Sequence, residues 1–148
     1  MNKEGKKKFL KKVENEILHK YKYWIAILDI KQYYLGRIFL FAKRLSATDM
    51  ISLNLKEREE LWVILKKIKK IYAKTFKPDK LNFAFLGNEL EHCHCHIIPR
   101  YIKKRTFNKI TFKDENYGHN YSRPNTKLFK IDDETYNKIF LYLKRYFK

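Results

Sequence analysis

The chain has 148 residues, 45% of them hydrophobic, and its 34 basic and 16 acidic residues give a net charge of +18. This length is typical of one globular domain, and no apolar run approaches the roughly 18 residues of a membrane span. Cys93 and Cys95 alternate with histidines, which excludes a disulfide framework, and no long apolar run follows the N-terminal lysines, so we expect a cytoplasmic protein with no secretory signal and no membrane partner.

The predicted elements begin with a helix over residues 5–22, where apolar residues recur at helical spacing. Two short apolar strands follow, Tyr23–Asp29 and Arg37–Ala42, and their short link suggests an antiparallel pair. Asn54 and Glu57 form a capping box before a helix that runs from Leu55 to about Phe76.

The second half of the chain predicts further strands and one helix. We expect strands over residues 81–86, from about Glu91 to Ile98, and, as a fifth, over residues 107–112. Residues 113–126 predict a loop, and Asp132 and Asp133 open a final helix. The order of elements predicts a single α+β domain with a mainly antiparallel sheet.

The residues most suited to chemistry are His92, His94 and His96, which alternate with Cys93 and Cys95. Side chains alternate between the faces of a strand, so the three histidines are expected on one face at roughly 7 Å per step. Three interpretations stay open: solvated polar residues, a zinc site, or a phosphate-handling site. Imidazole attacks phosphorus as a nucleophile, and the net charge of +18 favours a polyanion such as a nucleotide or nucleic acid. A solvated basic surface explains the same charge.

The stretch His92–Ile98 resembles the motif of the histidine triad (HIT) family, His-x-His-x-His followed by apolar residues. The segment from Ile27 to Arg44 is similar to the first hairpin of that family, and Pro99-Arg100-Tyr101 is similar to its bacterial-type branch. The resemblance covers residues 23–101, leaving residues 1–22 as an N-terminal helical extension and 102–148 as a C-terminal strand, loop and helix of the same domain.

The resemblance implies a five-stranded, mainly antiparallel sheet with helices, and a homodimer formed through a continuous sheet. It also implies hydrolysis or transfer of a nucleoside monophosphate from a dinucleoside polyphosphate or a nucleoside phosphoramidate. His94 would attack the α-phosphorus and form a nucleotidyl-histidine, while His92 and His96 would orient it and bind phosphate oxygens. Asn88 matches a phosphate-binding position and Asp29 a ribose-binding one. We expect no required cofactor, no protein-bound metal, and at most a divalent cation carried by the substrate phosphates.

Two positions depart from the family pattern. Arg37 and Leu45 stand where many members have histidine. Arg37 is suited to phosphate binding but not to proton donation near neutral pH. A nucleotide-binding module with little turnover therefore stays an alternative, as does a zinc-dependent protein acting on nucleic-acid ends. Tyr117, His119 and Tyr121 are interpreted as loop residues or as a cover over the substrate.

Overall fold

The structure is a computed structural model that describes residues 3–121 and 131–148. Its elements are, in chain order, α1 (Lys3–Lys12), the short 3-10 helix η1 (Glu14–Glu16), β1 (Ile17–Lys20), β2 (Trp24–Leu28), β3 (Ile38–Ala42), α2 (Leu55–Lys74), β4 (Lys80–Ala84), β5 (His94–Arg100), β6 (Arg105–Phe107), β7 (Ile110–Phe112) and α3 (Asp133–Lys144). Five strands form one antiparallel sheet in the order β1-β2-β3-β5-β4. The predicted α+β class and five-stranded antiparallel sheet are confirmed.

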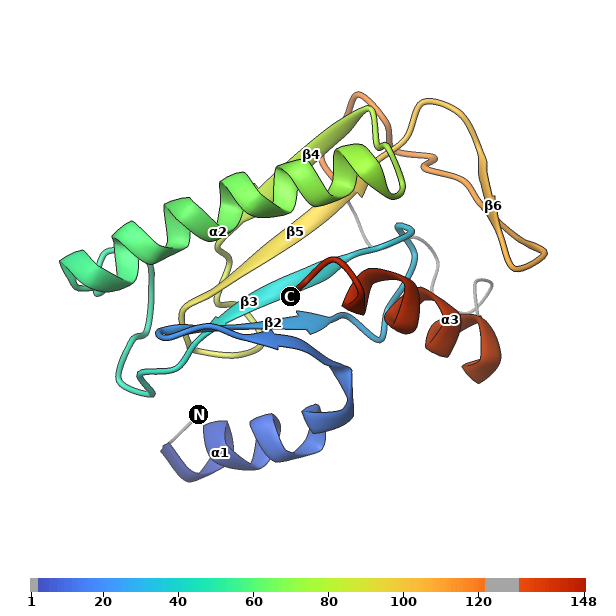
Figure 1. Ribbon diagram of the computed structural model, residues 1–148. Coiled ribbons are helices and arrows are strands. Elements are labelled where there is room, and N and C mark those ends of the chain that lie inside the picture. Colours follow the sequence, from blue (N-terminus) through green and yellow to red (C-terminus); the bar gives the residue numbers. More distant parts are fainter. Residues whose placement is uncertain (1–2, 122–130) are drawn as a thin grey trace.

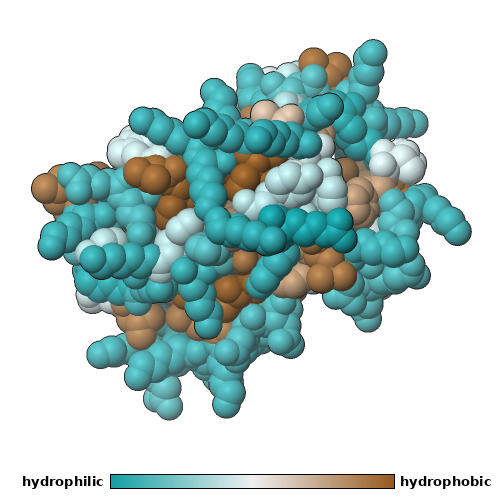
Figure 2. All heavy atoms as spheres, in the orientation of Figure 1, coloured by the Kyte–Doolittle hydropathy of each residue, from teal (hydrophilic) through white to brown (hydrophobic). Residues whose placement is uncertain are grey.

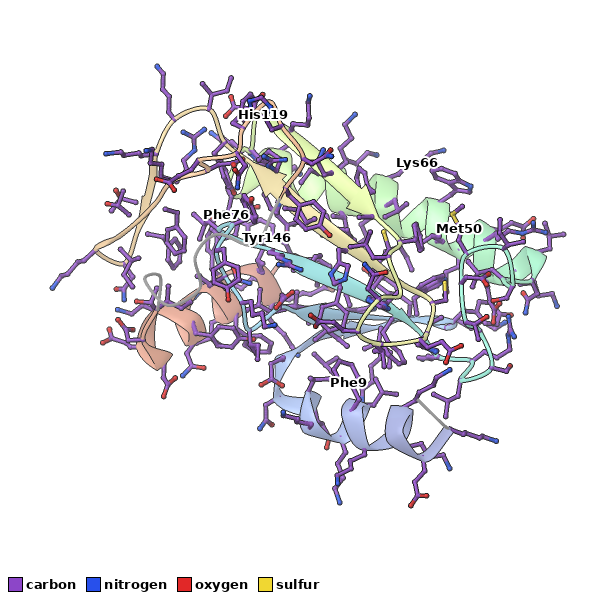
Figure 3. The ribbon with its side chains drawn as sticks, turned by 180° about the vertical axis from the view of Figure 1, so that it is seen from behind. Phe9, Met50, Lys66, Phe76, His119 and Tyr146 are labelled. Atoms are coloured by element: carbon purple, nitrogen blue, oxygen red, sulfur yellow. The ribbon has the colours of Figure 1, made fainter. Side chains whose placement is uncertain are left out.

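The sheet is covered on both faces, which is why every residue of β2 and β3 is buried. On one face, Ile64 and Ile68 of α2 and Ile139 of α3 join the main core. On the other face, Phe9 and Leu10 of α1, with Val13 just after it, pack against a smaller cluster that includes Phe39 and Phe41. Figure 1 shows α1 and α2 on opposite sides of the sheet, and Figure 3 shows Phe9 between α1 and the strands. The triad therefore lies on the α1 face, since Phe39 and Phe41 pair with His96 and His94.

The predicted helix over residues 5–22 is wrong in its second half. Helix α1 ends at Lys12, and Ile17–Lys20 instead forms β1, whose His19 and Lys20 pair with Ala26 and Ile25 of β2. Ile17 and Leu18 continue the helical spacing of apolar residues by coincidence. The pairing with β2 overrides that local preference, because a strand beside an existing sheet satisfies its backbone groups there.

The predicted fifth strand over residues 107–112 is also wrong. This segment belongs to a separate two-stranded sheet, β6 with β7. Asn108 and Lys109 have φ angles of 46° and 69°, as the type I′ turn of a two-residue hairpin requires. The fifth strand of the main sheet is β1. The predicted loop over 113–126 is described only to Tyr121, and residues 122–126 lie outside the described residues.

Helix α2 begins as predicted. The Asn54 side chain accepts a hydrogen bond from the Glu57 amide, and the Glu57 carboxylate accepts one from the Asn54 amide. The final helix also begins as predicted, with Asp132 as its N-cap. Both caps satisfy amide groups that have no partner inside the helix.

Gly36 forms the tight turn that leads into β3. Its φ is +82°, and a Cβ added there would lie 2.6 Å from Cδ2 of Phe76. The Phe76 ring is buried and packs against Tyr72 and Phe107, so it has little room to move. The Tyr72 hydroxyl also donates a hydrogen bond to the Gly36 carbonyl, which ties this turn to α2.

Replacing Gly36 with alanine is therefore expected to lower the free energy of unfolding by about 3 kcal/mol. Roughly 1–2 kcal/mol comes from the left-handed backbone and the rest from displacement of the Phe76 ring. Gly87 is the matched control, because its φ is +64° but nothing lies within 4 Å of its added Cβ. Urea denaturation should show a loss of only about 1 kcal/mol for Gly87→Ala. Equal losses in the two variants would show that the contact with Phe76 is unimportant.

Candidate active site

His94 and His96 lie on one face of β5, and Cys95 and Ile97 point into the core on the other. The Nε2 atoms of the two rings are 3.1 Å apart, and the ring centroids are 4.8 Å apart at an interplanar angle of 81°. Strand geometry thus brings these two imidazoles together as the sequence indicates.

His92 lies elsewhere. Strand β5 begins at His94, so the prediction that residue 92 belongs to the strand is wrong. The His92 ring is 1% exposed, is stacked on Phe41 at 3.9 Å, and has its Nε2 atom 2.7 Å from the Ala42 carbonyl oxygen. It is the His92 backbone that contacts the next histidine, because its carbonyl oxygen lies 2.7 Å from Nδ1 of His94.

These contacts assign the protons of the two cavity histidines. A carbonyl oxygen only accepts, so Nδ1 of His94 carries its hydrogen and Nε2 holds the lone pair. Nε2 of His96 then donates to Nε2 of His94. Nδ1 of His96 accepts from the Arg37 guanidinium, whose Nη2 atom is 3.4 Å away. The result is one connected chain of hydrogen bonds, Arg37 to His96 to His94 to the His92 carbonyl.

The electrostatic surroundings keep the triad neutral. Burial lowers the pKa of His96 to about 3, and repulsion from Arg37 and from a protonated His94 acts in the same direction. Burial also lowers the pKa of His92 to about 4. Burial is likewise the main reason that the pKa of His94 is lowered. All three rings are therefore uncharged near pH 7, which is the form in which an imidazole nitrogen acts as a nucleophile.

The lowered pKa of His92 makes stability depend on pH. The unfolded chain takes up this proton near pH 6.5 and the folded chain only near pH 4, so stability is present above pH 6.5 and is lost as the pH falls. We expect His92 to reduce the free energy of unfolding by about 2 kcal/mol between pH 7.5 and pH 5. Denaturation of wild type and His92→Gln at both pH values measures this, and the glutamine variant should show a smaller loss. Identical losses would contradict the assignment.

A cavity of about 510 Å³ opens at the two strand histidines. It is lined by Phe9, Lys12, Val13, Leu28, Asp29, Ile30, Lys31, Arg37, Phe39, Leu86, Asn88, Glu89, Leu90, His94, His96 and Tyr121. Five of the six candidate residues from the sequence lie in its wall, and His92 is the exception. The cavity has apolar sides and a polar end, as is typical of a site for an organic ligand with a charged group.

Asp29 and Arg37 contact each other at the polar end. Nε of Arg37 is 3.0 Å from Oδ2 of Asp29, and both side chains are largely buried. Oδ1 of Asp29 also accepts a hydrogen bond from the Lys31 amide. The Tyr121 ring lies over the guanidinium, 5.9 Å from ring centroid to Cζ. Arg37 is thus held by an ion pair on one side and an aromatic ring on another.

The sequence did not identify the part of this wall that comes from α1 and the residue after it. Phe9 and Lys12 lie in α1 and Val13 follows it, and their apolar stripe signals packing but not what it packs against. Of the three loop residues considered as a cover over the substrate, Tyr121 reaches this cavity. Tyr121 also lines, with Tyr117 and His119, a separate cavity of about 390 Å³ beside Arg100. Figure 3 shows His119 near the end of that loop, away from Phe9.

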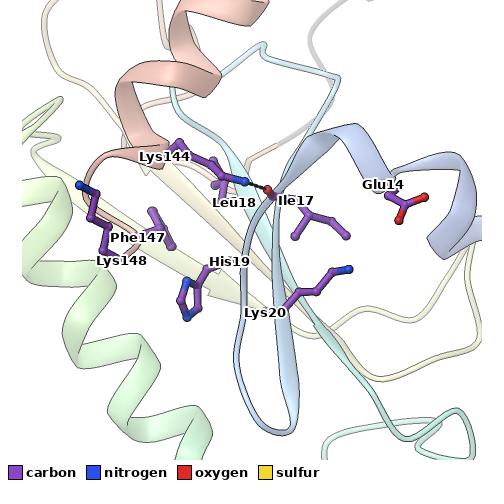
Figure 4. Close-up of a pocket in the computed structure, with 8 residues that line it drawn as sticks. All are labelled: Glu14, Ile17, Leu18, His19, Lys20, Lys144, Phe147 and Lys148. Atoms are coloured by element: carbon purple, nitrogen blue, oxygen red, sulfur yellow. Dashed lines mark hydrogen bonds between the residues drawn. The ribbon is translucent and has the colours of Figure 1, made fainter.

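Another cavity of about 510 Å³ lies at the β1 edge and contains His19 and Lys144 but no triad residue (Figure 4).

Across residues 3–121 and 131–148, no group of three His, Cys, Asp or Glu side chains is arranged to hold a metal ion. None of the described helices is long and apolar enough to cross a bilayer. On the face shown in Figure 2, hydrophilic side chains cover most of the surface, and hydrophobic side chains show in several separate places between them.

Comparisons with known proteins agree with this geometry. The HIT domain family matches residues 11–103. A bis(5'-adenosyl)-triphosphatase of Saccharomyces cerevisiae is 28% identical over 99 residues, which are 64% of this chain but only 47% of the yeast protein. The chain thus spans about half the length of the curated relatives that it matches.

Solved structures show the same fold. A histidine triad protein from Bradyrhizobium japonicum superposes with a TM-score of 0.67 at 18% identity, covering 93% of this chain and 95% of that one. A histidine triad nucleotide-binding protein from Sulfolobus tokodaii gives 0.64 at 17% identity, covering 89% and 83%. With the family match over residues 11–103, these likenesses establish that the chain belongs to the HIT domain family.

Proposed function

We propose that this protein is a nucleotide hydrolase or transferase that forms a covalent nucleotidyl intermediate on His94. The observation that carries this proposal is the hydrogen bond from Nδ1 of His94 to the His92 carbonyl, which leaves the lone pair on Nε2 at the cavity. The distant likeness to a yeast bis(5'-adenosyl)-triphosphatase supports the same reaction class.

The reaction has two steps. Nε2 of His94 attacks the α-phosphorus, the bond from phosphorus to the leaving group breaks, and the leaving group departs with the electron pair. Water then attacks the same phosphorus and loses a proton to the solvent, the phosphorus–nitrogen bond breaks, and the electron pair returns to Nε2. In the first step the Nε2 hydrogen of His96, which now contacts His94, turns to a phosphate oxygen.

The other wall residues would bind the nucleotide. Arg37 and Asn88 would contact phosphate oxygens, since a guanidinium and an amide both donate hydrogen bonds. Asp29 would accept hydrogen bonds from the ribose hydroxyl groups with the carboxylate lone pairs that Arg37 does not use. Any divalent cation would arrive on the substrate phosphates, and we propose no resident cofactor.

The direct test is incubation with diadenosine triphosphate, followed by chromatographic measurement of AMP and ADP. We expect equimolar AMP and ADP from the purified protein at pH 7, with and without added Mg²⁺. Tight calorimetric binding of AMP with no product over several hours would instead favour the second candidate function.

That second candidate is a nucleotide-binding module with little turnover. The observation that favours it is the contact between His96 and His94, which occupies the lone pair needed for attack. A second observation is Leu45, which stands where many family members have histidine. Its side chain packs against the cluster that includes Phe39 and Phe41, and its backbone carbonyl accepts a hydrogen bond from Lys6.

We also propose a homodimer, formed along the free edge of β4. Among the described residues β4 has a strand neighbour on one side only, and its Phe83 is 43% exposed. An open strand edge with an exposed aromatic side chain is a ready surface for a second copy. Light scattering during size-exclusion chromatography should give about twice the 18.2 kDa chain mass. A mass of one chain at micromolar concentration would contradict this proposal.

A further inference from the structure

We propose that Arg37 makes this site selective for leaving groups that depart as anions without a proton, so that it cleaves phosphoanhydrides and discriminates against phosphoramidates. This inference rests on the proposed function, because it assigns a substrate class to the same reaction. It comes from the geometry around His96, whose two ring nitrogens both have partners that restrict where a proton can sit.

The first step of the argument concerns Nδ1 of His96. Its partner is the Arg37 guanidinium, which has only donors and stays charged at any ordinary pH. A proton on Nδ1 would place two donors, both positively charged, against each other. His96 is therefore held as the neutral ring with its single hydrogen on Nε2, and its lowered pKa agrees with that geometry.

Arg37 cannot easily move aside to release this restriction. Its Nε atom pairs with Asp29 at 3.0 Å, and the Tyr121 ring covers the guanidinium. Only 7% of the residue is exposed. Moving the guanidinium away would leave the buried Asp29 carboxylate without its partner, which is costly in a site of low polarity.

The remaining groups at the cavity do not replace His96 as an acid. They are Asp29, Glu89, Lys12, Lys31 and Tyr121. Carboxylates are ionised at neutral pH and hold no proton, while ammonium and phenol groups release theirs reluctantly. His94 spends its lone pair on phosphorus, and its Nδ1 hydrogen stays on the His92 carbonyl. Among residues 3–121 and 131–148, the cavity therefore offers no proton donor matched to neutral pH.

The consequence depends on the bond that breaks. In a phosphoanhydride the departing oxygen belongs to a phosphate, which is stable as an anion and needs no proton. In a phosphoramidate the departing nitrogen would be a strongly basic amide ion, so a proton must reach it as the phosphorus–nitrogen bond breaks. General acid catalysis typically contributes about 10²–10⁴-fold to such a step. The lack of a proton donor thus slows the cleavage of phosphoramidates and not that of phosphoanhydrides.

The experiment compares kcat/KM for diadenosine triphosphate and adenosine 5'-phosphoramidate in wild type, Arg37→Gln and Arg37→Lys. A glutamine amide donates to the neutral Nδ1 of His96 or accepts from a protonated one, so it permits both states of the ring. A lysine ammonium only donates, so it keeps the restriction and is the matched control. Wild type should prefer the phosphoanhydride by at least about 100-fold.

Arg37→Gln should reduce that preference at least about tenfold, and Arg37→Lys should hold it within about threefold. The glutamine variant should also gain phosphoramidate activity as the pH falls from 8 to 6, which a structural defect would not produce. A wild-type preference for the phosphoramidate, or equal changes in the two variants, would overturn the proposal.

Wild type alone provides a second test that does not depend on a folded variant. With aryl esters of AMP, kcat/KM should fall steeply as the pKa of the departing phenol rises, because no acid assists departure. A flat dependence would also overturn the inference. The proposed function fails separately, if neither substrate yields monophosphate or if release is unchanged in His94→Ala.

Discussion

Replacing His94 with alanine is expected to lower monophosphate release from diadenosine triphosphate by at least about 10⁴-fold. The variant has no atom that can attack phosphorus, and loss of a nucleophile removes nearly all the rate that a covalent mechanism supplies. His96 does not replace it, because its hydrogen is on Nε2 and its Nδ1 lone pair faces Arg37. Single-turnover kinetics with excess enzyme measures the loss.

His19→Ala is the matched control, since this histidine lies on β1 in a different cavity. Its activity should remain within about twofold of wild type, because it touches no group of the triad cavity. Quenching wild type in alkaline denaturant should also trap labelled nucleotide on the chain, and tryptic mapping should place the label on His94. A His94→Ala rate within tenfold of wild type would exclude this residue as the nucleophile.

Much of the site could be predicted from the sequence because its signals are local. The alternation of histidine with cysteine fixes which side chains share a face of β5, and this holds for His94 and His96. Asn54 and Glu57 mark the start of α2 for the same reason, since a capping box is contained in four residues. Such patterns need no knowledge of the rest of the chain.

The errors come from contacts between distant segments. His92 follows the alternate spacing of the triad in sequence, but it precedes β5. Its ring stacks on Phe41 and its Nε2 atom contacts the Ala42 carbonyl oxygen. Ile17 and Leu18 keep the period of a helix, but pairing with β2 makes them a strand. In each case, a local repeat continues past the point where tertiary packing takes over.

The charge arrangement of the site also lies beyond local reasoning. Asp29 and Arg37 were assigned to ribose and phosphate separately, and the ion pair between them was not predicted. That pair forms where β2 and β3 run side by side, whereas the contact from Arg37 to His96 depends on β3 lying beside β5. The most specific chemical inference about this protein therefore requires the fold, although each residue in it is visible in the sequence.

The second large effect is expected at a buried ion pair that anchors the C-terminal loop. Nε of Arg100 is 2.7 Å from Oδ2 of Asp114, and the two side chains are 4% and 1% exposed. Asp114→Asn keeps the shape but removes the charge, which leaves the guanidinium buried without its counter-ion. We expect the free energy of unfolding to fall by about 3 kcal/mol and the melting temperature by about 6–12 °C, as measured by calorimetry.

Glu115→Gln is the matched control, because it makes the same chemical change one residue further on. Glu115 pairs with Lys113 at 3.2 Å, but those side chains are 67% and 58% exposed, so its loss should cost less than about 0.5 kcal/mol. Equal losses in the two variants would mean that Arg100 is held mainly by its other partners, the Asn82 side chain and the carbonyl groups of Asn116 and His119. A selective loss in Asp114→Asn would show that burial, and not the number of ion pairs, determines how firmly this loop is held. Because the loop continues to Tyr121, the same anchor would also support the ring that covers Arg37.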